Sequence, residues 1–184
     1  MSMRGISGLR GLSERPRGLR PPEAVLAPDK MPSTDLPDEV RTWATKMGER
    51  MARIVWKLKQ SGVVGSALEL IVYHELERKL GKQPSSVWSF QSSQFGGRAF
   101  RFGLVLDFTI LVGAGVGIIR CQGLYWHTRG ESEAQDRAHK FRLLRSRIMG
   151  RKVLWVADIW ETAAYRHPSK VVEDALHGRD SMKG

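Results

Sequence analysis

The chain has very little cysteine, no long apolar run and few acidic residues for its basic content. Its single cysteine, Cys121, cannot form an internal disulfide and excludes a zinc site built from several cysteines, so a reducing compartment is expected. No apolar stretch approaches the roughly 20 residues that a helix needs to cross a bilayer. These absences predict a soluble, cytoplasmic protein.

Acidic residues are outnumbered, with 19 Asp and Glu against 30 Lys and Arg, which gives a formal net charge of +11. A surplus of this size favours an anionic partner, most simply nucleic acid, with an acidic membrane surface as the weaker alternative. We therefore expect a nucleic-acid partner, DNA above all, and no membrane association. The 184 residues suit one main domain with tails.

The composition changes along the chain and divides it into four parts. Residues 1–36 repeat Arg-Gly and Arg-Pro units without periodicity, which is typical of a flexible basic arm that contacts phosphates. An unstructured tail or an organelle transit peptide are the alternatives. Residues 37–61 have apolar residues at helical spacing and predict one amphipathic helix, residues 62–178 the main domain, and residues 179–184 a tail. The arm and the first helix are also candidate surfaces for protein partners.

The main domain alternates helical and strand patterns. A helix over residues 66–80 begins after a Gly-Ser cap and ends at Gly81. Strands are predicted over residues 87–93, 104–112, 116–122 and 152–157, and they form a mixed sheet of about four or five strands. The predicted fold class is therefore α/β, more narrowly α+β, with helices flanking the sheet and a helical extension at the N-terminus.

The stretch over residues 103–127 predicts a β-hairpin with a Gly-Ala-Gly turn. Asp107 is the only charge in its first strand, and a lone carboxylate in an apolar strand must be paired, hydrogen-bonded, metal-bound or placed at the edge of the sheet. In the second strand, the period of two places Ile118, Arg120 and Gln122 on one face. We expect Asp107 and Gln122 to share that face, with His127 close by.

Two motifs in this hairpin resemble a known family. The first is Gly-x-x-x-Asp-Phe at residues 103–108, and the second is Gln-Gly-x-Tyr-Trp-His at residues 122–127, followed by a basic helix. Together they resemble the PD-(D/E)XK nuclease superfamily, and within it the very short patch repair endonucleases and related phage-borne proteins. The resemblance covers roughly residues 65–161 and implies a restriction-endonuclease-like fold.

The resemblance also implies a site for Mg²⁺ or Mn²⁺. It assigns the metal to Asp107, Glu69 and the backbone carbonyl of Cys121, and it makes His127 the acid or base that moves a proton. Gln122 stands where many members have a lysine and is expected to orient water. From the residues alone, Glu69 is equally well a surface glutamate, and His127 could simply pack at the end of the sheet.

One position departs from the family pattern, because Arg120 stands where many members have an acidic residue. An arginine facing a metal site repels the metal unless its guanidinium reaches a phosphate instead. Two functions therefore stay open. The protein is a metal-dependent DNA endonuclease that hydrolyses phosphodiester bonds, or it is a degenerate nuclease fold that binds DNA or serves as a structural component, plausibly of a phage particle. The second reading would make it phage-associated.

The helix after the hairpin has the highest density of basic residues in the chain. We expect it to bury Phe141 and to pair Asp136 with Lys140 four residues on, while its exposed basic side chains form a groove for a polyanion. The predicted nucleic-acid-binding residues are Arg120, Arg137, Lys140, Arg142, Arg145 and Arg147.

Overall fold

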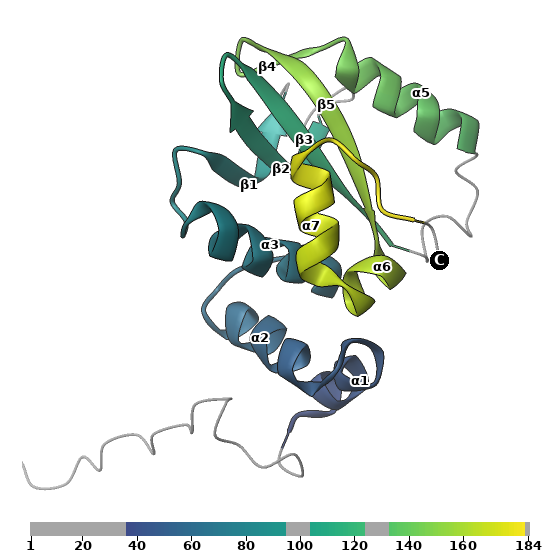
Figure 1. The fold of residues 1–184 in the computed structure, drawn as a ribbon. Helices are drawn as coiled ribbons and strands as arrows, with labels where there is room; N and C mark the ends of the chain where they lie inside the picture. The colour runs from purple at the N-terminus through teal and green to yellow at the C-terminus, as the bar shows by residue number, and fades with distance from the viewer. Residues whose placement is uncertain (1–35, 95–103, 124–132, 183–184) are drawn as a thin grey trace, which may run out of the picture.

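The structure is a computed structural model of the chain, and it describes residues 36–94, 104–123 and 133–182. A five-stranded mixed sheet lies at its centre with helices on both faces (Figure 1). The α+β fold predicted from the sequence is therefore confirmed. The predicted basic arm and His127 lie outside the described residues, whereas Leu36 is buried and already belongs to the core.

The sheet has the strand order β1-β2-β3-β5-β4. The first three strands form an antiparallel meander, β3 and β5 pair in parallel, and the short β4 pairs antiparallel with β5 at the edge. The predicted hairpin is thus present, with Gly113 in its turn at a φ of 54°. The strands are β1 (Trp88–Gln94), β2 (Leu104–Val112), β3 (Gly115–Gln122), β4 (Arg147–Ile148) and β5 (Arg151–Trp160).

Helices α3 (Ala67–Leu80) and α7 (Pro168–Leu176) cover one face of the sheet, and α5 (Glu133–Leu144) covers the other. On the α3 side, Phe108, Ile119 and Ile159 are buried in the same cluster as the apolar stripes of both helices. On the α5 side, Leu143 packs into a smaller cluster with strand residues that include Ile118. The two faces therefore have separate cores, and each strand side chain belongs to one or the other.

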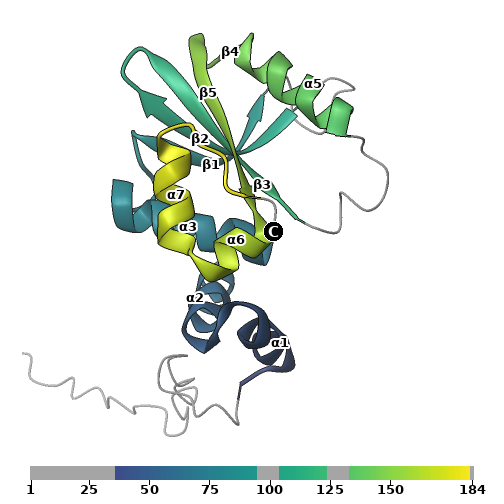
Figure 2. The same ribbon diagram turned by 45° about the vertical axis from the view of Figure 1, so that its right-hand side comes forward.

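The predicted helix over residues 37–61 is two helices, α1 (Asp38–Met47) and α2 (Glu49–Gln60), so the prediction of one helix was wrong. Gly48 breaks it with φ 82° and ψ 150°, a conformation that is essentially restricted to glycine. The predicted apolar stripe is nevertheless buried or half-buried, and it packs the pair against α3 and Tyr165 (Figure 2). Within the described ranges, none of the helices is long and apolar enough to cross a membrane.

The predicted tail after residue 178 is not separate from the domain. Ser181 donates its backbone N–H to the carbonyl of Asp158 at 2.9 Å, and Trp160 donates its own to Ser181 Oγ at 2.8 Å. The segment after α7 thus lies along the end of β5, just before α6 (Glu161–Arg166) begins. The domain boundary predicted at residue 178 falls too early.

Candidate active site

Asp107 lies at an irregularity in the middle of β2. The pairing of β2 with β3 stops at Phe108 and Ile119, and the pairing with β1 passes from Phe108 to Leu106. Asp107 therefore lies where the regular pairing of β2 is interrupted, between Leu106 and Phe108. Its neighbour across β1, Gln91, has a positive φ of 48°, which is uncommon for a residue with a side chain.

This irregularity changes which face the side chains of β2 occupy. Leu106 belongs to the core on the α5 side, whereas Phe108 belongs to the core on the α3 side, although residues two apart in a regular strand share a face. At the break, the Asp107 carboxylate accepts a hydrogen bond at 2.7 Å from the backbone N–H of Cys121. A side chain thus binds the β3 backbone where the β2–β3 ladder has ended.

Asp107 opens onto a cavity of about 630 Å³ that also contains two other predicted metal ligands, Glu69 and Cys121. The cavity has a third carboxylate, Glu161, which follows β5 directly and was not assigned a role from the sequence. Lys46 of α1 lines it as well and forms no ion pair within the described residues. The complete lining is Trp43, Lys46, Ser66, Ala67, Leu68, Glu69, Asp107, Cys121, Gly123, Glu161 and Tyr165.

Glu69 is held in place by the start of α3. It accepts a hydrogen bond from the backbone N–H of Ser66 at 2.7 Å, and Ser66 Oγ accepts one from the Glu69 N–H at 3.2 Å, which is a complete capping box. Its other oxygen lies 3.5 Å from the amide nitrogen of Gln91. Glu69 is therefore not a surface glutamate paired with a base, and its carboxylate has a defined direction at the cavity wall.

The thiol of Cys121 takes no direct part in this chemistry. Burial raises its pKa well above the ordinary value, and the neighbouring carboxylates of Asp107, Glu69 and Asp158 raise it further. The thiol therefore stays protonated near neutral pH, since only a thiolate is a good nucleophile or metal ligand. What Cys121 offers the cavity is its backbone.

Gln122 is not on the face of Asp107, so the prediction that they share a face was wrong. Its amide Nε2 donates to Asp158 Oδ1 at 3.3 Å, and Gln122 does not line the cavity. The period of two along β3 correctly groups Gln122 with Arg120, but the break in β2 turns Asp107 towards Cys121 instead. The sequence pattern carries no sign of such a break.

Arg120 is buried in a network of charged groups on the α5 side of the sheet. Its side chain is 9% exposed, and its guanidinium lies 2.6 Å from Asp158 Oδ1 and 3.0 Å from Asp136 Oδ1. Lys140 completes the network, with its ammonium 3.0 Å from Asp158 and 2.6 Å from Asp180. The predicted Asp136–Lys140 ion pair was therefore wrong, because each residue pairs with a different partner brought by the sheet or the C-terminal segment.

The network fixes the charge of both strand residues. Burial by itself would raise the pKa of Asp158, but its hydrogen bonds and ion pairs with Arg120 and Lys140 outweigh burial and lower it. Burial would likewise lower the pKa of Arg120, and its contacts with Asp158 and Asp136 raise it instead. Arg120 and Lys140 therefore both neutralise the buried carboxylate of Asp158 in this structure.

The other predicted phosphate contacts lie on the surface. Arg137 and Arg142 on α5 and Arg145 directly after it are exposed, and they form no ion pair within the described residues. Arg147 of β4 is also exposed and donates to the carbonyl of Gly150 at 3.1 Å. Because α5 covers the face opposite α3, these groups are not part of the cavity that contains Asp107.

The carboxylates around the cavity are the type of donor that Mg²⁺ prefers, namely hard oxygen ligands. The type of donor atom therefore fits the predicted ion, but the distances between these carboxylates do not define a metal centre. Across residues 36–94, 104–123 and 133–182, no three His, Cys, Asp or Glu side chains lie close enough together to hold an ion. His127 is not among those residues.

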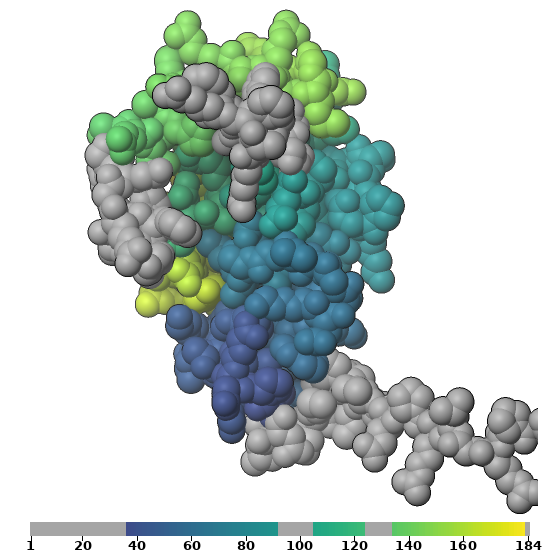
Figure 3. Space-filling model, turned by 180° about the vertical axis from the view of Figure 1, so that it is seen from behind, coloured from purple at the N-terminus to yellow at the C-terminus, as the bar shows by residue number. Residues whose placement is uncertain are grey.

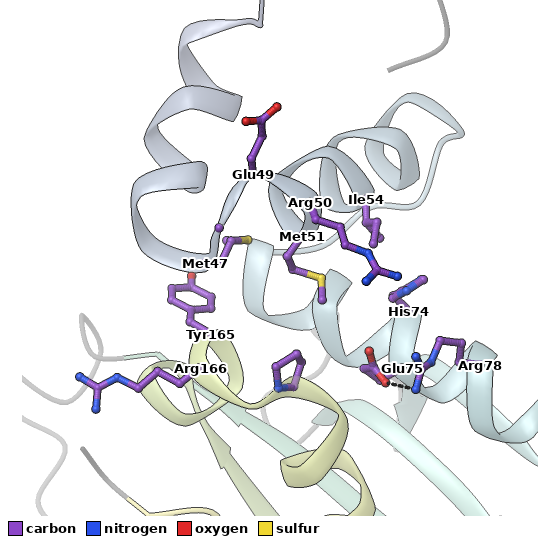
Figure 4. Close-up of a pocket in the computed structure, with 12 residues that line it drawn as sticks. Met47, Glu49, Arg50, Met51, Ile54, His74, Glu75, Arg78, Tyr165 and Arg166 are labelled. Carbon is purple, nitrogen blue, oxygen red and sulfur yellow. Dashed lines mark ion pairs between the residues drawn. The ribbon is translucent and has the colours of Figure 1, made fainter. Parts of the chain in front are cut away.

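A second cavity, of about 380 Å³, lies between the helical pair, α3 and α6 and contains none of the predicted site residues (Figure 4). Glu75 is its most buried charge, and Glu75 Oε2 has no hydrogen-bond partner but lies 3.3 Å from the Arg78 guanidinium. Met47, Met51 and Tyr165 form part of the cavity wall and are largely apolar (Figure 4). This cavity thus lies beside the packing contact between the helical pair and the main domain.

No protein-family model matches the chain, and neither a curated protein nor a solved structure gives a significant match.

Proposed function

We propose that this protein is a metal-dependent DNA endonuclease whose active site is the cavity of Asp107, Glu69 and Cys121. The observation that carries the proposal is their convergence, because three residues assigned from sequence motifs, on a helix and two strands, line one cavity. The net charge of +11 supports a polyanionic substrate.

Asp107 and Glu69 would hold Mg²⁺ or Mn²⁺ together with the carbonyl of Cys121, while Glu161 lines the same cavity without being assigned to the ion. The ion would supply positive charge for the phosphate and an activated water for the attack. The protein supplies positioning: the Cys121 N–H holds Asp107, and the capping box holds Glu69. Both are short contacts to the backbone, which gives each carboxylate a fixed anchor.

Proton transfer is assigned to His127, whose imidazole titrates near working pH. Gln122 has no part in the proposal, since it contacts Asp158 on the other face of the sheet. Tyr165 donates a hydrogen bond to Glu161 at 2.7 Å, and burial followed by the contact with Glu161 raises its pKa, so it stays protonated and acts as a donor.

A second candidate function is DNA binding or a structural role without catalysis. The Arg120 network favours it, because a position that is acidic in many members of the resembled family is here a buried cation neutralised by Asp158 and Asp136. A protein that has exchanged a metal ligand for a structural ion pair keeps its fold without the chemistry.

Asp107→Asn separates the two candidates. Asparagine keeps an oxygen that accepts from the Cys121 N–H, so the variant should fold, while its metal affinity and its Mg²⁺-dependent cleavage should be lost. Calorimetric titration with Mn²⁺ and cleavage of duplex, mismatched, branched and single-stranded DNA measure the two effects. Asp174→Asn, on α7 outside the cavity, is the matched control and should behave as the parent.

His127→Ala should slow cleavage by about 10²–10⁴-fold.

The second candidate is supported if the parent cleaves none of these substrates while the parent and Asp107→Asn bind DNA equally. A third result would remove Asp107 from the chemistry. If Asp107→Asn unfolds the protein and leaves metal affinity of the remaining folded fraction unchanged, Asp107 serves only as the acceptor for the Cys121 N–H.

A further inference from the structure

Helix α5 exposes an aromatic ring on a cationic surface. The apolar spacing of the sequence predicts Phe141 to be buried, but it is 58% exposed. Among the described side chains of this helix only Leu143 is buried, so the helix contacts the sheet along a narrow line. The position of Phe141 therefore does not follow from core packing.

One of the two acidic residues of the helix, Asp136, pairs with the sheet. Asp136 pairs with Arg120, and Lys140 pairs with Asp158 and Asp180. One acidic and one basic side chain of α5 are therefore neutralised within the network. Arg137, Arg142 and Arg145 stay exposed, without an ion pair in the described part of the chain. The exposed side chains of this surface therefore include Phe141 and the guanidinium groups of Arg137, Arg142 and Arg145, the last of which directly follows the helix.

Phe141 and Arg145 form a single unit. The Arg145 guanidinium lies 5.2 Å from the centroid of the Phe141 ring, within the range of a cation–π contact. An aromatic ring with a planar cation beside it is a surface on which a nucleobase can stack, and the neighbouring guanidinium groups can contact the phosphates on either side.

We propose that Phe141 and Arg145 form a stacking platform for an unpaired base, so that α5 binds single-stranded nucleic acid. The inference rests on the nucleic-acid partner of the proposed function and adds the class of substrate. Duplex DNA hides the faces of its bases and gives the ring nothing to stack on, whereas every base of a single strand has a free face. A protein partner is disfavoured because one ring among three cations offers little apolar area and much charge that would need to be desolvated.

The platform is separate from the cavity. It lies on the opposite face of the sheet, and α5 is at the other end of the molecule from α1 and α2 (Figure 3). Binding can therefore be measured in EDTA, where no metal-dependent cleavage takes place.

The test is fluorescence anisotropy of a labelled oligodeoxythymidylate and of a duplex of equal length over a series of salt concentrations. Phe141→Ala should weaken single-strand binding by roughly 5- to 150-fold without changing the salt slope, since stacking releases no counterions. Arg142→Ala should instead reduce the slope by about 0.7. Phe141→Tyr should bind as the parent, because it keeps an aromatic face. Met149→Ala is the control, since Met149 is another large exposed apolar side chain, 62% exposed, beside α5 in sequence.

The platform is excluded if Phe141→Ala binds the single strand as tightly as Met149→Ala does. It is also excluded if Phe141→Ala weakens the single strand and the duplex equally, since the ring then only supports phosphate contacts. A parent that binds neither nucleic acid at low salt overturns both the platform and the proposed function. A parent that binds with the expected Phe141 dependence but cleaves nothing overturns the nuclease alone.

Discussion

At the scale of the residue, two carboxylates on apolar strands have opposite surroundings. Asp158 contacts two cations, and their charge lowers its pKa below the ordinary value. Asp107 instead accepts from a backbone N–H and opens onto a cavity with two other carboxylates, Glu69 and Glu161. A carboxylate neutralised by two cations has little left to offer a metal, so Asp158 is assigned to the structural network, and the metal-binding role stays with Asp107 as part of the proposal.

Asp158→Asn should destabilise the fold by about 3 kcal/mol, because Arg120 and Lys140 each lose a buried counter-charge, although each keeps one other partner. The pKa of Asp158 in the folded state lies below its ordinary value of 3.8. Its carboxylate therefore stabilises the fold fully above that value, and the contribution is lost as the pH falls through the folded pKa. Urea unfolding between neutral and acidic pH measures both effects.

The Asp158→Asn curve should lack the part of the acid destabilisation that the parent shows below about pH 4. Asp174→Asn is the comparison, because it removes an aspartate whose ion pairs with Lys170 and Arg179 are on the surface, and it should change stability much less. Equal losses in the two variants would mean that the buried network contributes no more than a surface pair.

At the scale of the element, the break at Gly48 decides what the N-terminal helices can reach. A continuous helix would extend away from the main domain, whereas the two short helices fold back and pack on α3 and Tyr165. As a result, Trp43 and Lys46 of α1 line the cavity that contains Asp107. The helical extension is therefore part of the candidate active site and not only a docking surface.

Gly48→Ala should cost about 1–3 kcal/mol in unfolding free energy, because φ 82° with ψ 150° is a conformation for glycine alone. A clash cannot be the cause, since a Cβ at Gly48 would meet no heavy atom within 4 Å. Chemical denaturation measures the cost, and Thr45→Ala on the exposed side of α1 should stay within about 0.5 kcal/mol of the parent. A Gly48→Ala variant as stable as the parent would show that this backbone conformation is not needed.

At the scale of the whole molecule, the positive charge is divided between buried and exposed groups. Some of the basic residues neutralise a carboxylate inside the fold, as Arg120 and Lys140 do with Asp158. Others, such as Arg142 and Arg145, are on the surface without an ion pair in the described residues. The net charge of +11 therefore does not show where the exposed positive charge lies. The structure places part of it on α5 and directly after it.

Replacing Arg142, Arg145 and Arg147 together by Ala should flatten the salt dependence of DNA binding by up to about one unit for each phosphate contact that is lost. Arg147 should contribute least, since its guanidinium is also bound to the carbonyl of Gly150. Arg179→Ala is the matched control, because that arginine is exposed but paired with Asp174. A slope that is unchanged in the triple variant would place the DNA on another surface.

Local patterns predicted most elements correctly. Capping residues predicted helix α3 with its cap at Ser66, and a glycine turn predicted the hairpin of β2 and β3. A run of β-branched residues predicted strand β5. These signals are local because each depends on neighbours only a few residues away. The two-residue strand β4 and the break at Gly48 were missed, since a short edge strand has almost no pattern and an isolated glycine is tolerated in many helices.

By itself, the sequence determined the fold class and the strongly cationic character, and it indicated that Asp107 needs a partner, because a lone charge in an apolar strand does so wherever the strand lies. Only the tertiary structure decided which partner each charge has. The break in β2 turned Asp107 towards Cys121 and Glu69, and packing of α5 and the C-terminal segment brought Asp136, Lys140 and Asp180 to the strand pair of Arg120 and Asp158. Contacts of this kind join residues far apart in the chain, so they depend on the packing of whole elements and leave no periodic trace in the sequence.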